Sequence, residues 1–116
     1  MPFLLSQRRP FVADHFHEAP YFEEARHGHN WMVEAAVEVD EAIGEGGEPA
    51  FAEALDAWVA GLDYTVLNDQ PRLQGRNPTT ELLGQWACEH LAAQGLRVAW
   101  VKVREKANYW ALCRPA

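Results

Sequence analysis

Residues 29 to 39 alternate between apolar and polar side chains, and this pattern constrains the fold of the chain more than any other. The apolar face consists of Trp31, Val33, Ala35, Val37 and Val39, and the opposite face includes Asn30, Glu34 and Glu38. Successive side chains of a strand point to opposite faces of a sheet, so the segment predicts a long strand that is buried on one side. Because the chain has 116 residues, we expect one domain over residues 1–116 rather than two lobes around a cleft.

The rest of the chain predicts an α+β fold with a four-stranded antiparallel sheet. Residues 3 to 17 indicate extended chain, and residues 96 to 105 and 108 to 113 indicate two further strands. Residues 50 to 60 follow a helical period, and a second helix should begin near Asn77-Pro78-Thr79-Thr80-Glu81 and end at Gly95. Residues 40 to 49 and 66 to 78 are expected to be loops. The order strand, strand, helix, helix, strand, strand places two helices on one face of the sheet and leaves the other face for a partner.

Composition argues against several classes of function. The formal net charge is -7 and the pI is about 5.1, whereas a general nucleic-acid binder presents a basic field. No apolar run is long enough to span a bilayer, and no charged-then-apolar leader is evident, so we expect a cytoplasmic protein that does not bind membranes. Cys88 and Cys113 do not suggest a disulfide framework.

Four of the five histidines lie between residues 15 and 29. His27 and His29 are two residues apart in extended chain, so their imidazoles point to the same side. His15 lies near the end of the preceding strand and can sit opposite this pair, and His17 has the same strand parity and is an alternative to it. Three neutral imidazoles with one open position are typical of a catalytic zinc site, although an isolated His-x-His motif is usually a surface feature. His90 is expected to pack on a helix.

Five short motifs occur in the same order as in one known family. They are Phe11-Val12-Ala13-Asp14-His15, His27-Gly28-His29-Asn30-Trp31, Leu62-Asp63-Tyr64-Thr65-Val66-Leu67-Asn68-Asp69, Asn77-Pro78-Thr79-Thr80-Glu81 and Val103-Arg104-Glu105. The set resembles the 6-pyruvoyltetrahydropterin synthase family, which includes the 6-carboxytetrahydropterin synthases of the queuosine pathway. The resemblance implies a tunnelling fold, or T-fold, in which the sheets of several subunits join into a barrel. It therefore implies a homo-oligomer, a tetramer or a hexamer, with active sites at subunit interfaces.

The resemblance also implies roles for individual residues. Zn²⁺ would be held by His15, His27 and His29, and Glu105 would anchor a pterin ring, because one carboxylate can accept two N–H donors at once. Thr79 and Thr80 match a segment that helps to hold the pterin from a neighbouring subunit. The implied partner is a small-molecule pterin, not a nucleic acid or a membrane.

The chain departs from the usual family pattern at two places. Where relatives have the cysteine of Cys-x-x-x-His-Gly-His, this chain has Glu23, and the next residue, Glu24, gives Glu-x-x-His-Gly-His. This resembles the subgroup with glutamate in place of cysteine, whose members release 6-hydroxymethyl-7,8-dihydropterin from 7,8-dihydroneopterin triphosphate. We expect Glu24 or Glu23 to be the base, assisted by Asp63 and Tyr64. Tyr64 stands where relatives commonly have histidine, and tyrosine is a poor base at neutral pH.

The leading hypothesis is therefore a zinc-dependent pterin lyase acting on 7,8-dihydroneopterin triphosphate. Its triphosphate would need local cations, for which the candidates are Arg26, Arg72, Arg76, Lys102, Arg104 and Lys106. One alternative is a 6-carboxytetrahydropterin synthase of the queuosine pathway, and a second is a catalytically impaired paralogue that binds zinc and pterin. A third is a non-enzymatic subunit whose sheet only builds a barrel.

Overall fold

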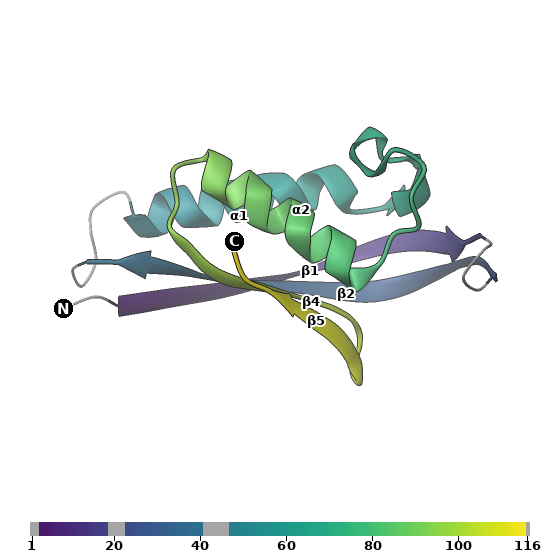
Figure 1. Ribbon diagram of the computed structural model, residues 1–116, viewed down its shortest axis with the longest axis horizontal. Coiled ribbons are helices and arrows are strands. Elements are labelled where there is room, and N and C mark those ends of the chain that lie inside the picture. Colours follow the sequence, from purple (N-terminus) through teal and green to yellow (C-terminus); the bar gives the residue numbers. More distant parts are fainter. Residues whose placement is uncertain (1–2, 19–22, 41–46, 116) are drawn as a thin grey trace.

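The computed structural model describes residues 3–18, 23–40 and 47–115. Most of this part belongs to β1 (Phe3–His17), β2 (Glu24–Val39), α1 (Gly47–Leu62), α2 (Thr80–Ala93), β4 (Val98–Lys106) and β5 (Tyr109–Cys113). Both helices lie on the same face of the sheet (Figure 1). The predicted α+β fold with two helices on one face is therefore confirmed.

The sheet has five strands rather than the predicted four, in the order β3-β1-β2-β4-β5. The additional strand, β3 (Thr65–Val66), pairs in parallel with β1 at Ala13 and Asp14. Two residues are too few to show an alternating pattern, so the sequence could not indicate this strand. The segment predicted as a loop over 66 to 78 also contains two 3-10 turns, Leu67–Asp69 and Pro71–Leu73.

Strand β2 begins at Glu24, before the alternating segment of residues 29 to 39 and before His27, the first residue expected in this strand. Its antiparallel pairing with β1 continues past the alternating segment until His17 lies opposite Glu24. The early part of the strand carries arginine, histidine and glycine instead of alternating apolar residues, so hydrophobic periodicity does not identify it as a strand. Helix α1 begins at Gly47, and residues 41–46 of the predicted loop lie outside the described residues.

The core lies between the sheet and the helices. Trp31, Val33, Ala35 and Val37 are at most 1% exposed, as their alternation predicts. The ring of Trp31 stacks on Phe11 with centroids 5.9 Å apart, and its Nε1–H donates to the backbone oxygen of Ala13. Burial of each large apolar side chain contributes roughly 1.5–3 kcal/mol. The core therefore holds β1 and β2 side by side directly next to the segment that carries the histidines.

The sheet face opposite the helices is uncovered in a single chain. Leu4 is 58% exposed on this face, and Trp110 and Leu112 of β5 are 51% and 42% exposed. The ammonium group of Lys102 lies 4.5 Å from the centroid of the Trp110 ring. No helix among the described residues is long and apolar enough to cross a membrane.

Candidate metal centre and substrate cavity

Three histidines and one glutamate meet on the helix-covered side of the sheet. The pairing of β1 with β2 places His15 opposite His27 and brings His29 one step further along the same face. Glu105 comes from β4, the neighbour of β2. The Nε2 atoms of His15 and His27 are 3.1 Å apart, and Oε1 of Glu105 lies 3.1 Å from Nε2 of His15 and 2.8 Å from Nε2 of His29. The fold thus brings the three predicted histidines together in one group that could hold a metal ion.

Backbone carbonyls determine which nitrogen carries the proton in two of these rings. Nδ1 of His15 lies 3.3 Å from the oxygen of Pro78, and Nδ1 of His27 lies 2.7 Å from the oxygen of Ala25. Because a carbonyl oxygen only accepts, each Nδ1 donates, and each Nε2 of the neutral rings presents a lone pair.

The third imidazole has an orphaned buried nitrogen. Among the described residues, Nε2 of His29 has no hydrogen-bond partner, although the Glu105 carboxylate is close to it. A short distance from His29 to Glu105 without a hydrogen bond, together with the carbonyls behind the rings of His15 and His27, is the arrangement expected of imidazoles that converge on a metal. The donor set of imidazoles and a carboxylate fits zinc.

Electrostatics keep the central histidine neutral. The side chain of His15 is 1% exposed, and this burial lowers its pKa below the ordinary value of 6.5. The neighbouring His27 and His29 also lower the pKa of His15, whereas Glu105 and the Pro78 carbonyl raise it without reversing the shift. A neutral imidazole is the form that binds a metal ion, so His15 is ready to act as a ligand at neutral pH.

Of the two candidate bases, the fold brings Glu24 to the histidines. Its Oε1 lies 3.4 Å from Nε2 of His27 and 3.9 Å from Nε2 of His15. Glu24 also forms a second possible metal-binding group with His15 and His17, the predicted alternative to His15. Glu23 is exposed and directly precedes β2, and the described cavity and histidine contacts involve Glu24 instead.

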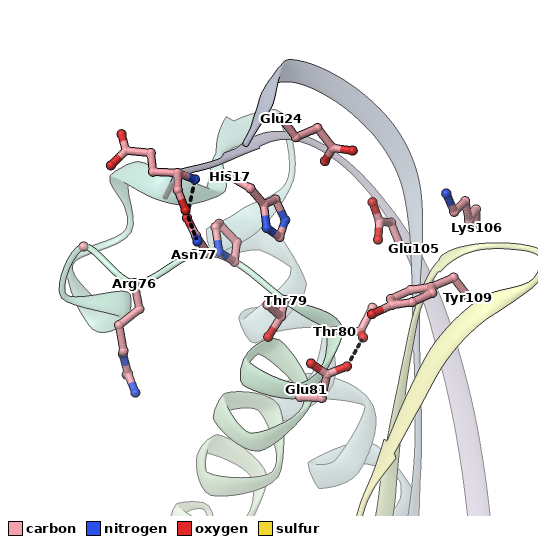
Figure 2. A pocket seen from close by; sticks show the side chains of 13 residues that line it. His17, Glu24, Arg76, Asn77, Thr79, Thr80, Glu81, Glu105, Lys106 and Tyr109 are labelled. Atoms are coloured by element: carbon pink, nitrogen blue, oxygen red, sulfur yellow. Dashed lines mark hydrogen bonds between the residues drawn. The ribbon is translucent and has the colours of Figure 1, made fainter. Parts of the chain in front are cut away.

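A cavity of about 870 Å³ opens beside the histidine group. Figure 2 shows its wall, which includes His17, Glu24, Thr79, Thr80, Glu105 and Tyr109. Thr79 caps α2, where its side chain accepts the N–H of Leu82 at 3.1 Å, and the buried Thr80 hydroxyl donates to Glu81 at 3.0 Å. A single copy of the chain therefore brings both threonines to the same cavity as its own Glu105.

Sequence reasoning missed three residues that shape this cavity. Tyr109 of β5 lines the same cavity as Glu105 (Figure 2). Asn77 holds the end of β1, because its side chain accepts from the N–H of Glu18 at 3.0 Å and donates to the oxygen of Glu18 at 3.1 Å. Pro78 contributes the carbonyl that orients His15. An asparagine or a proline in a polar segment suggests only a turn, so the sequence offers no specific signal for these roles.

Asp63 and Tyr64 lie at the edge of β1, away from the cavity of the same chain. Oδ1 of Asp63 accepts the N–H of Val12 at 2.8 Å, and the N–H of Tyr64 donates to the oxygen of Val12 at 2.5 Å. Tyr64 has a φ of 58°, a region that residues with side chains rarely adopt, and its side chain is 83% exposed. In one chain, these two residues extend the sheet edge rather than contact the histidines.

Two of the six candidate cations, Arg76 and Lys106, line the described cavity. The others belong to different surroundings: Arg26 pairs with Asp14 at 3.0 Å, Arg72 pairs with Glu89, Lys102 lies over Trp110, and Arg104 is opposite Trp110 in the sheet. The same cavity is lined by four carboxylates, Glu18, Glu24, Glu81 and Glu105. An anionic substrate would therefore depend on few local cations.

Comparison with known proteins agrees with the geometry of the site. The family model of 6-pyruvoyl tetrahydropterin synthase matches residues 4–116. A protein of Archaeoglobus fulgidus that carries the provisional name 6-carboxy-5,6,7,8-tetrahydropterin synthase is 34% identical over 92 residues, which cover 76% of this chain and 75% of that protein.

Solved structures show the same fold at low sequence identity. The 6-pyruvoyl tetrahydropterin synthase of Caenorhabditis elegans superposes with a TM-score of 0.84 at 13% identity and covers 100% of this chain and 97% of its own. The Plasmodium falciparum enzyme gives a TM-score of 0.74 at 17% identity over 98% of each chain. A Plasmodium vivax enzyme variant, in which alanine replaces a catalytic glutamate, gives 0.73 at 15% identity over 99% of this chain and 98% of its own. The T-fold of the single chain is thus established, and, because the family model spans nearly the whole sequence, the chain belongs to the 6-pyruvoyl tetrahydropterin synthase family.

Proposed function

We propose that this chain is a zinc-dependent pterin lyase that acts on 7,8-dihydroneopterin triphosphate or a closely related pterin. The observation that carries the proposal is the convergence of three histidine Nε2 atoms at a cavity whose wall holds Glu24 and Glu105. Membership of the 6-pyruvoyl tetrahydropterin synthase family supports lyase chemistry on a pterin.

Each part of the site has a separate role in this proposal. His15, His27 and His29 would hold the zinc ion, which when bound makes a nearby substrate hydroxyl more acidic. Glu24 takes the proton, because its carboxylate lies 3.4 Å from Nε2 of His27 and so within reach of a group that approaches the histidines. Glu105 accepts the N–H groups of the pterin ring in a bidentate contact.

A glutamate base favours 6-hydroxymethyl-7,8-dihydropterin as the product. The Plasmodium vivax relative, a 6-pyruvoyltetrahydropterin synthase, has a glutamate among its catalytic residues, which supports a glutamate base in this chain. Arg76 and Lys106 are the cavity cations that would receive the triphosphate.

The test is incubation of the zinc-loaded protein with 7,8-dihydroneopterin triphosphate, followed by mass analysis of the products. Glu24→Gln should reduce turnover by about 100-fold or more, which is the usual contribution of a general base. The neighbouring Glu23→Gln is the matched control and should retain most of the activity. Absence of both turnover and pterin binding would refute the proposal, and loss of activity in Glu23→Gln alone would reassign the base.

Two other functions have specific support. The Archaeoglobus fulgidus relative favours a 6-carboxytetrahydropterin synthase of the queuosine pathway, which a 6-carboxy product would establish. Tyr64, which stands where relatives commonly have histidine, and the glutamate in place of the usual cysteine favour a paralogue that binds zinc and pterin but has lost catalysis. Tight pterin binding without product, unchanged in Glu24→Ala, would favour the paralogue.

We also propose that the chain forms a homo-oligomer, a tetramer or hexamer with its sites at subunit interfaces. The exposed Trp110 and Leu112 on the uncovered sheet face and the exposed Tyr64 at the opposite edge support this assembly. A stable monomer in light scattering would contradict it.

A further inference from the structure

Glu105 lies at the boundary between the histidine group and the cavity. Of the four members of that group, Glu105 is the one that also lines the cavity. Its side chain is 14% exposed, so the carboxylate is largely withdrawn from water. A buried carboxylate needs a positive partner or several donors, and this position offers both a metal site and a substrate site.

The position of this carboxylate is that of a metal ligand. In a tetrahedral zinc site with bonds of about 2.0–2.1 Å, neighbouring ligand atoms are roughly 3.3 Å apart. Oε1 of Glu105 is 3.1 Å from Nε2 of His15 and 2.8 Å from Nε2 of His29, and Nε2 of His27 is 3.1 Å from that of His15. These spacings are within about half an ångström of the tetrahedral value.

The other nearby carboxylate, Glu24, lies further from the histidine nitrogens and is more exposed to water. Oε1 of Glu24 is 3.4 Å and 3.9 Å from Nε2 of His27 and His15, and its side chain is 40% exposed. Glu105 is therefore closer to the histidine nitrogens and more deeply buried than Glu24.

We propose that Glu105 is the fourth ligand of the metal when no pterin is bound, and that the pterin ring displaces it. The inference rests on the proposed function, because it requires a metal at the histidines and Glu105 as the pterin anchor. A carboxylate that accepts two N–H groups of a pterin turns both oxygens toward the cavity and leaves the metal. Without substrate, the metal would have four protein ligands, as in a structural metal site. When the pterin ring binds, one position at the metal would become free, as in a catalytic site.

The experiment compares Co²⁺-loaded wild type, Glu105→Gln and Glu81→Gln. Visible absorption of Co²⁺ reports a change in its ligands, and competition with a chromophoric chelator measures Zn²⁺ affinity. Glu105→Gln should change the spectrum and weaken Zn²⁺ binding by about tenfold or more, by analogy with losses of 10–100-fold for outer-shell partners. Glu81 lines the same cavity but is outside the histidine group, so Glu81→Gln should alter neither quantity.

Unsubstituted pterin provides the second half of the test, because it has the ring that Glu105 recognises but no side chain that could reach the metal. Its addition to the Co²⁺-loaded wild type should shift the spectrum and weaken Zn²⁺ binding. Pterin and metal should therefore reduce each other's affinity by the same factor. Pterin binding without a spectral change would overturn the displacement.

The outcomes separate this inference from the proposed function. If Glu105→Gln keeps the wild-type Co²⁺ spectrum and Zn²⁺ affinity while His27→Ala binds Zn²⁺ much more weakly, Glu105 is not the fourth ligand. That result would leave the proposed histidine metal site intact. A wild-type chain that binds no metal would overturn both. Thermal melting of the metal-free variants checks their folding, and Glu105→Asp, which keeps a shorter carboxylate, should give an intermediate affinity.

Discussion

Replacement of Gly84 by alanine should force the Cys113 side chain or α2 to shift, and a shift of α2 would weaken the candidate metal centre. Gly84 is buried, and a Cβ at this position would stand 2.8 Å from Sγ of Cys113 and 3.7 Å from Cγ2 of Val103. Alanine gains about 1 kcal/mol over glycine in a helix, whereas overpacking of a well-packed interface costs about 1–3 kcal/mol. We therefore expect the free energy of unfolding to fall by roughly 0–2 kcal/mol.

Gly61→Ala is the matched control in the other helix. Gly61 belongs to α1, and a Cβ there would meet nothing within 4 Å. The same propensity gain without the clash should raise stability by up to about 1 kcal/mol. With an unfolding entropy of about 2.1 cal/mol/K per residue, 1 kcal/mol corresponds to about 4 °C for this chain, so the two variants should melt about 4–12 °C apart. Equal increases in melting temperature, measured at equal protein concentration, would refute the packing argument.

The effect should extend to metal binding, because the first turn of α2 follows Pro78, whose carbonyl lies 3.3 Å from Nδ1 of His15. Gly84→Ala should lower Zn²⁺ affinity, and Gly61→Ala should not. Combining Gly84→Ala with Cys113→Ala removes the Sγ atom nearest to the new Cβ. The double variant should regain part of the lost stability and part of the lost Zn²⁺ affinity, since contacting residues couple by about 0.5–3 kcal/mol. Unchanged Zn²⁺ affinity in Gly84→Ala would show that the helix position does not control the site.

Three other predictions concern pH, thiol reactivity and assembly. Burial lowers the pKa of His15 below 6.5 in the folded, metal-free chain. The unfolded chain therefore takes up a proton on His15 at a higher pH than the folded chain does, so the contribution of the neutral His15 to the free energy of unfolding is complete above pH 6.5 and is lost as the pH falls through the folded pKa. The loss is at most about 1.4 kcal/mol per pH unit. Urea unfolding at pH 7 and pH 5 should show this loss, and His15→Gln should reduce it. Burial raises the pKa of Cys88 and of Cys113, so iodoacetamide at pH 7 should label the native chain slowly and the unfolded chain quickly, and rapid native labelling would argue against this. Leu112→Lys should lower the mass in light scattering, and a mass equal to that of the wild type would mean that this face is not an interface.

Much of the fold was predictable because its signals are local. The alternation from residue 29 to 39 identified the buried face of β2, and the Asn-Pro-Thr-Thr-Glu segment identified the start of α2, where Thr79 is the cap. Strand β3 was not predictable, because it has two residues and depends on pairing with Ala13 and Asp14 of β1. The start of β2 at Glu24 was not predictable for a related reason, because pairing with β1 extends the strand into a segment whose own sequence has no periodicity.

The sequence alone identified the chemistry of the site, because three histidines at strand spacing and a glutamate in a family motif are properties of residue type and order. Only the tertiary structure decided how these groups meet. It brought Glu24 rather than Glu23 to the histidines, placed Asp63 and Tyr64 at a sheet edge, and set Glu105 between the histidine nitrogens and the cavity. The physical reason is that strand register and the carbonyls behind the imidazoles act across the chain, so the position of a donor atom depends on partners that its neighbours in the sequence do not specify.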